Sequence, residues 1–179
     1  MASQYYITIN LDPHYQRFLR SQFLCESEVF EFPSRHRFNT MLEHFVITKP
    51  HGYVAPEEET SMFKIALPNF EYKNPDHFRY LSSVKEAVFK SKIKEFYDWI
   101  IQERISKLMK RPEKREDGNM ITLDRQQCTL VLIDEFGFDA NDRDSFDRLY
   151  KLFTRYKKKE VNRRFTVKKK VEKELIKSV

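Results

Sequence analysis

The stretch that most constrains the fold is a long amphipathic segment from Leu81 to about Arg111. Its apolar side chains recur at helical spacing with Lys, Glu and Gln between them, and they are Leu81, Val84, Val88, Ile93, Phe96, Tyr97, Ile100, Ile105 and Leu108. This period predicts a single helix, which at 1.5 Å per residue would be roughly 45 Å long. We therefore expect it to be the spine of the molecule.

Shorter elements precede this helix. Three stretches favour strands, namely residues 5–11, 28–32 and 62–68. Two helices are expected between them, the first starting at Asp12-Pro13 and the second capped by Ser34. Residues 48–61 hold two prolines, a glycine and an acidic cluster, so they are expected to form a loop. This order predicts an α+β fold with a small N-terminal sheet of about three strands packed with helices.

Residues 129–138, TLVLIDEFGF, pose a question of function. Four apolar residues followed by Asp134 and Glu135 resemble the strand of a nucleotide-hydrolysing enzyme that ends at a magnesium-binding acid. The chain has only three glycines, however, and no two of them lie close together. Neither a phosphate-binding P-loop nor a dinucleotide-binding turn can be written with them. The ATPase interpretation is therefore rejected.

The same stretch has two structural interpretations. As a helix, it would be capped by Asp124 with Gln127 three residues on, and would end at a left-handed Gly137 followed by Phe138. As a strand, residues 128–133 would form a buried β-branched run. The flanking caps favour the helix, although periodicity alone does not separate the two.

Charge is distributed unevenly along the chain. Residues 151–179 contain twelve Lys or Arg and three Glu, a net charge of +9, so the first 150 residues carry −3 of the total of +6. Such an asymmetry indicates a polyanionic partner. Together with the polar stretch 111–119, it predicts an N-terminal α+β body at 1–72, a central helix and linker at 73–119, and a basic helical region at 120–179, with a single compact unit as the alternative.

The basic region predicts a two-faced helix. Phe146, Leu149, Tyr150 and Phe153 cluster on one side of a helical wheel, and cationic residues cluster on the other. A row of guanidinium and ammonium groups suits a phosphate backbone or a DNA groove. The expected nucleic-acid contacts are Arg148, Lys151, Arg155, Lys158, Lys159, Arg163, Arg164, Lys168, Lys169 and Lys170.

A resemblance points the same way. The run EFGFDANDRDSFDRLYKLFTRYKKKEVNRRF resembles the C-terminal tail of small uncharacterised proteins carried by bacterial phages and mobile elements. The resemblance covers roughly forty residues from Leu123 onward and implies DNA binding through a helix-turn-helix-like unit. The turn in this chain is longer than the three or four residues usual in such units.

The sequence contains little that indicates an enzyme. Asp139 and Asn141 begin like a calcium loop, but Asp144 stands where glycine is needed and Tyr150 where glutamate is needed. Helix capping explains the same acids. The five histidines and two cysteines lack metal-ligand or catalytic spacing. We expect a protein with no cofactor and no metal that is not an enzyme, while a nuclease or recombinase with a site assembled from distant residues stays open.

The expected function is therefore nucleic-acid binding, for example in a regulator, with double-stranded DNA favoured over RNA. The alternative is a structural or virion-type assembly protein in which the long helix forms a homo-oligomer interface. The chain has no apolar run long enough for a membrane span, its N-terminus does not resemble a signal peptide, and its cysteines suit a reducing compartment. A cytoplasmic location, or a virion, is expected.

Overall fold

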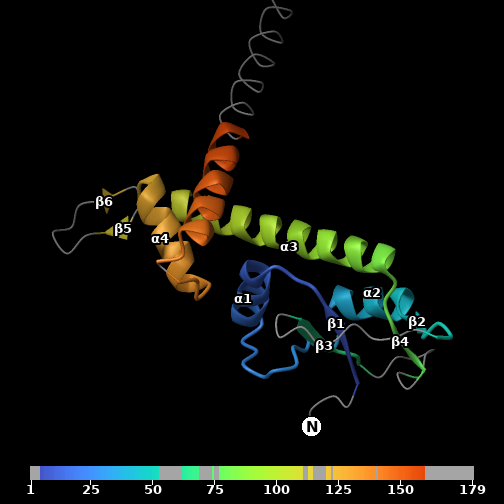
Figure 1. The fold of residues 1–179 in the computed structure, drawn as a ribbon. Helices are drawn as coiled ribbons and strands as arrows, with labels where there is room; N and C mark the ends of the chain where they lie inside the picture. Colours follow the sequence, from blue (N-terminus) through green and yellow to red (C-terminus); the bar gives the residue numbers. More distant parts are fainter. Residues whose placement is uncertain are drawn as a thin grey trace, which may run out of the picture. The chain divides into compact units, whose positions relative to one another are not determined.

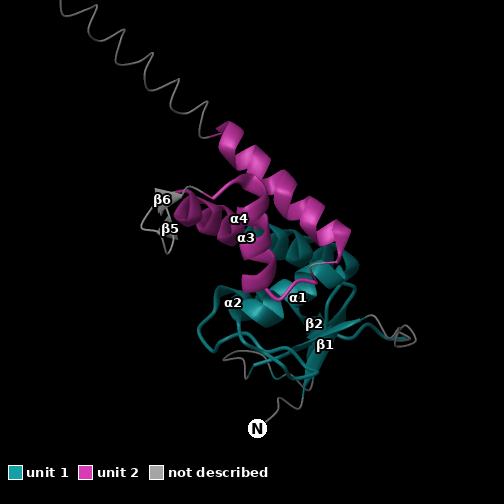
Figure 2. Ribbon diagram, turned by 90° about the vertical axis from the view of Figure 1, so that its left-hand side faces the viewer, with its two compact units in different colours: residues 1–97 teal, residues 98–179 magenta. Residues whose placement is uncertain are grey.

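The computed structural model describes most of the chain, namely residues 5–52, 62–68, 74, 77–110, 113–114, 120–121, 123–139 and 141–159 (Figure 1). The chain groups into two compact units, residues 1–97 and 98–179 (Figure 2). Their boundary lies inside the helix α3, Ser83–Lys110. The regions expected at 1–72, 73–119 and 120–179 stay a prediction, whereas the α+β class with dominant helices is confirmed.

The main sheet of unit 1 is built from two strands and one bridging residue. Strand β1, Tyr6–Ile9, pairs antiparallel with β3, Phe63–Ala66, so that Tyr6 faces Ala66 and Ile9 faces Phe63. Alternation along β1 buries Ile7 and Ile9 on the same face. The stretch expected as a strand at 28–32 contributes a single parallel bridge at Phe30, whose N–H donates to the Lys64 carbonyl over 2.9 Å.

A second strand pair lies where the sequence predicted no sheet. Strand β2, Ile47–Thr48, pairs antiparallel with β4, Phe78–Tyr80. Two residues are too few to leave a periodic signal. The expectation of one sheet of about three strands is therefore corrected to two separate antiparallel pairs in this unit.

The start predicted for the first helix at Asp12-Pro13 is confirmed. Helix α1, Pro13–Gln22, starts with proline, and the carboxylate of its N-cap Asp12 accepts from the His14 N–H over 2.9 Å. Its apolar face buries Phe18 and Leu19 completely. Local capping chemistry therefore decides where this helix begins.

The second helix begins later than expected. Helix α2, Arg37–Phe45, is capped by His36 rather than Ser34, because the Nδ1 of His36 accepts from the Phe38 N–H over 3.4 Å. The imidazole stacks on Phe32, with ring centroids 5.5 Å apart, and contacts Phe38 and Phe96 edge-on or tilted. Burial lowers the pKa of His36, and the adjacent Arg37 charge lowers it further.

This histidine predicts a pH dependence of stability. The unfolded chain, with a pKa near 6.5, binds the proton more tightly than the folded chain does. The contribution of His36 is therefore complete above about pH 6.5 and is lost as the pH falls through the lower pKa of the folded state. We expect His36→Asn, which keeps a capping oxygen, to lose less stability than the wild type between pH 7.5 and 5 in thermal unfolding. Parallel pH profiles of the two proteins would contradict this assignment.

The core of unit 1 is aromatic. Six fully buried large side chains are phenylalanines, and they are Phe18, Phe30, Phe32, Phe38, Phe63 and Phe89. Their rings meet mostly edge-to-face or tilted, as between Phe30 and Phe32 at 4.8 Å. Phe30, Phe32 and Phe63 are therefore core residues and are not available to stack on the bases of a nucleic acid.

The apolar stripe predicted along helix α3 is only partly buried. Within unit 1 its buried residues are Phe89, Ile93, Phe96 and Tyr97, and within unit 2 they are Ile101 and Ile105. Val84 and Val88 belong to the expected stripe but are 70% and 41% exposed. Helical spacing shows which residues share a side, but it does not show where along the helix the packing begins.

Candidate nucleic-acid interface

The structure of unit 2 shows whether Asp134 and Glu135 end a strand or a helix. Residues 128–133 lie inside helix α4, Arg125–Glu135, so the strand alternative is wrong. The predicted capping box is present, since the Asp124 carboxylate accepts from the Gln127 N–H over 2.8 Å and the Gln127 side chain accepts from the Asp124 N–H. Glu135 forms an ion pair with Arg104 of α3. These acids therefore occupy a helix end and not the end of a nucleotide-binding strand.

A tight turn follows α4 and reverses the chain. Gly137 has φ +61°, and its N–H donates to the Asp134 carbonyl over 3.2 Å. The Phe138 N–H donates to the Ile133 carbonyl over 2.9 Å, which completes a Schellman motif. The left-handed conformation predicted for Gly137 is thereby confirmed.

The next helix covers residues 143–159 and is called the basic helix below. Its N-cap is Asp142, whose carboxylate accepts from the Asp144 N–H over 3.1 Å and from the Ser145 hydroxyl over 2.7 Å. Asp139 accepts from the Asn141 N–H over 2.8 Å in the same turn. The acids considered as metal ligands thus serve as caps, and among the described residues no three His, Cys, Asp or Glu are grouped as a metal site.

The basic helix has one well-buried side. Leu149 and Phe153 are buried as predicted, and Ser145 and Leu152 are buried with them. Phe146 and Tyr150 are half-buried and stack on each other with ring centroids 5.8 Å apart. The buried side is therefore centred nearer to Leu152 than to Tyr150. It is turned slightly about the helix axis from the side that the sequence predicted.

Three of the predicted contact residues form a cationic face. Lys151, Arg155 and Lys158 follow one another at i, i+4 and i+7 and are exposed. We call these three residues the basic face, and Lys159 is exposed beside it. Among the described residues, no carboxylate forms an ion pair with any of the four.

The remaining predicted contacts differ from these four. Arg148 is half-buried and already takes part in an interaction within the protein. The last five lie outside the described residues, and they are Arg163, Arg164, Lys168, Lys169 and Lys170. The described part of the candidate interface is therefore carried by the second half of the basic helix.

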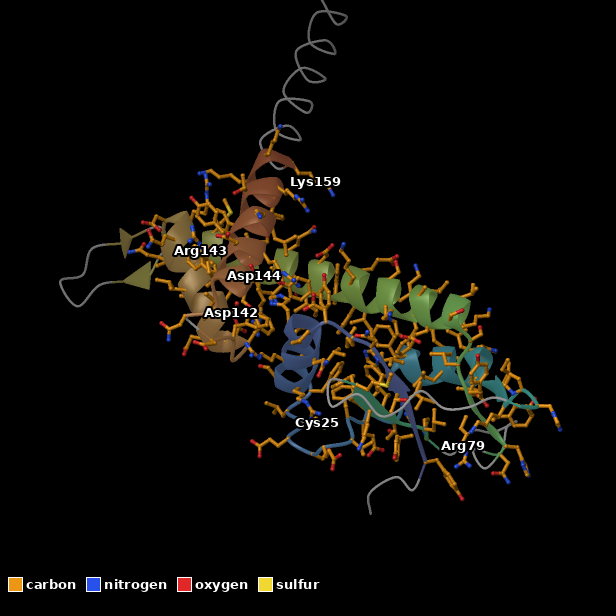
Figure 3. All side chains as sticks on the ribbon, viewed as in Figure 1. Cys25, Arg79, Asp142, Arg143, Asp144 and Lys159 are labelled. Atoms are coloured by element: carbon orange, nitrogen blue, oxygen red, sulfur yellow. The ribbon has the colours of Figure 1, made fainter. Side chains whose placement is uncertain are left out.

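The exposed side of the basic helix changes its charge along its length. Asp144 and Asp147 precede Lys151 at helical spacing, and both are exposed. Figure 3 shows Asp142 and Asp144 at the start of the helix and Lys159 at the other end. Acids are favoured near a helix N-terminus by its dipole, and cations near the C-terminus. The exposed side is therefore acidic at Asp144 and Asp147 and cationic at Lys151, Arg155, Lys158 and Lys159.

The fold also brings in a cation that the sequence analysis missed. Arg125 starts α4, and its Nη1 donates to the Thr154 hydroxyl of the basic helix over 3.2 Å, across 29 residues of sequence. Its guanidinium carbon lies 4.7 Å from the centroid of the Tyr150 ring. These contacts place α4 and the basic helix side by side (Figure 2). The run of cations after residue 150 does not reveal this neighbour, because only tertiary packing creates it.

No protein-family model, curated protein or solved structure matches this chain. The resemblance of the C-terminal part to phage and mobile-element proteins therefore stays a prediction. In the part of the chain that the structure describes, no helix combines the length and apolarity that a membrane crossing requires.

Proposed function

We propose that this protein binds double-stranded DNA without catalysing a reaction on it, and that the basic face is the docking surface. The observation that carries the proposal is the set of exposed cations at Lys151, Arg155 and Lys158, with which no described carboxylate forms an ion pair. The proposed role is that of a phage or mobile-element DNA-binding protein, such as a regulator, in the cytoplasm or a virion.

The spacing of these cations suits a phosphate backbone. Lys151 and Lys158 are separated along the helix axis by about 10 Å, at 1.5 Å per residue. Phosphates of one DNA strand follow each other every 3.4 Å or so along the duplex axis, so this length spans about three of them. Phosphate contacts of this kind set affinity and position, and base reading by Arg155 or Lys151 from the same face would add specificity.

A salt titration tests the proposal. We expect the full-length protein to bind a fluorescent duplex with an affinity that falls as salt rises, by about 0.9 log units per decade of salt for each phosphate contact. Three contacts on the basic face predict a slope steeper than about −2.7. An affinity that salt leaves unchanged would refute the proposal, as would binding to anionic lipid vesicles without any binding to the duplex.

One observation favours assembly as a second candidate function. Helix α3 exposes Val84, Val88 and Trp99, which are 70%, 41% and 59% accessible. Exposed apolar side chains on a long helix suit an interface between copies of the chain. Light scattering separates the candidates, because a stable higher oligomer without affinity for duplex DNA supports assembly and contradicts the docking proposal.

A further inference from the structure

We propose that Arg125 is a pre-oriented phosphate-binding residue that extends the basic face from the neighbouring helix α4. This inference rests on the proposed function and names an additional residue of the same interface. Arg125 belongs to a different helix from the other cations, and its position beside them results from the packing of the two helices.

The side chain of Arg125 is held by two contacts on the basic helix. Its Nη1 donates to Thr154 Oγ1 over 3.2 Å, and the Thr154 hydroxyl in turn donates to the Tyr150 carbonyl over 2.8 Å. The guanidinium also lies over the Tyr150 ring at 4.7 Å, a distance typical of cation–π contacts. An arginine held in this way has little conformational entropy left to lose when it binds a ligand.

Most of its hydrogen-bonding capacity remains unused. A guanidinium has five N–H donors in a planar fork, and among the described residues the contact to Thr154 is its only hydrogen bond. The side chain is half-buried and therefore still reaches solvent. A phosphate is a suitable partner, because the fork matches two of its oxygens and forms a bidentate contact.

The position of Thr154 places this fork next to the basic face. Thr154 lies three residues after Lys151 and four before Lys158, so all three are neighbours on the helix surface. Arg125 therefore stands at the flank of the basic face. One further positive charge, supplied from α4, would contact a phosphate beside the line of the other three cations.

Three variants test this role by duplex binding across salt concentrations. Arg125→Gln removes the charge and is expected to lower affinity about eightfold at 0.1 M salt and to reduce the slope by about 0.9. Arg125→Lys retains the charge, so it is expected to keep the slope while losing affinity through the lost fork. Thr154→Val leaves the arginine and its contact with Tyr150 in place but removes the hydrogen bond that orients the side chain, so about a threefold loss with an unchanged slope is expected.

Thermal unfolding of each variant separates binding from structure. A residue that merely ties the two helices together would lower the melting temperature in Arg125→Gln and leave the salt slope unchanged, and this outcome overturns the inference. Equal affinities of wild type and Arg125→Gln overturn it as well. Failure of the proposed function looks different, because the wild type itself would then show no salt-dependent binding.

Discussion

Neutralising the basic face is expected to abolish most duplex binding. In the triple variant Lys151→Gln, Arg155→Gln and Lys158→Gln, three phosphate contacts are lost. Each contact contributes about 0.9 log units at 0.1 M salt relative to 1 M, so affinity should fall roughly 500-fold and the salt slope should decrease by about 2.7. The measurement is fluorescence anisotropy with a labelled duplex over a range of salt concentrations.

A matched control separates this effect from net charge. Arg35, Arg79 and Lys94 are exposed residues of unit 1, and changing all three to Gln removes the same three positive charges. We expect this control to retain the wild-type slope. Similar losses in both triple variants would show that the protein binds through its overall charge, and the assignment of the interface to the basic helix would then be wrong.

Truncating Phe38 is expected to cause the largest loss of stability. The side chain is completely buried and contacts the rings of Phe32, Phe89 and Phe96 at centroid distances of 4.9, 5.5 and 5.6 Å. Phe38→Ala removes this burial and leaves a cavity, so it should lower the free energy of unfolding by about 3–5 kcal/mol. Domains of this size are stable by only about 5–15 kcal/mol, so urea unfolding would detect the change readily.

Two other substitutions serve as controls for the predicted loss of stability. Phe38→Leu fills most of the site and should cost less than the alanine variant. Val84→Ala truncates an apolar side chain that is 70% exposed, so the free energy of unfolding should change by less than about 0.5 kcal/mol. A loss at Val84 as large as that at Phe38 would contradict the core described for unit 1.

Features with short-range causes were predictable from the sequence. The cap at Asp12, the capping box of Asp124 and Gln127, and the left-handed Gly137 depend on groups within five residues of one another. The choice of helix for residues 128–133 followed from those caps. Short-range hydrogen bonds have few competing partners, and this is why residue type and spacing were sufficient.

Features with long-range causes were not predictable. Strand pairing reduced the expected strand at 28–32 to the bridge of Phe30 with Ile65, and it created β2 and β4 from stretches without a strand pattern. His36 replaced Ser34 as a cap because the surrounding phenylalanine rings hold its imidazole in place. Neither outcome leaves a periodic signal in the residues themselves.

The features of the candidate interface also fall into those that the sequence predicts and those that it does not. The amino-acid sequence by itself determined that the cations gather after residue 150, and that Lys151, Arg155 and Lys158 share one side of a helix, because charge and helical period are properties of the chain alone. Only the tertiary structure decided that Leu152 is buried, that Arg148 is already engaged, and that Arg125 lies against Tyr150. Those outcomes depend on which helices pack against each other. Packing brings together residues that are far apart in the sequence, and their positions in the sequence do not reveal that they are in contact.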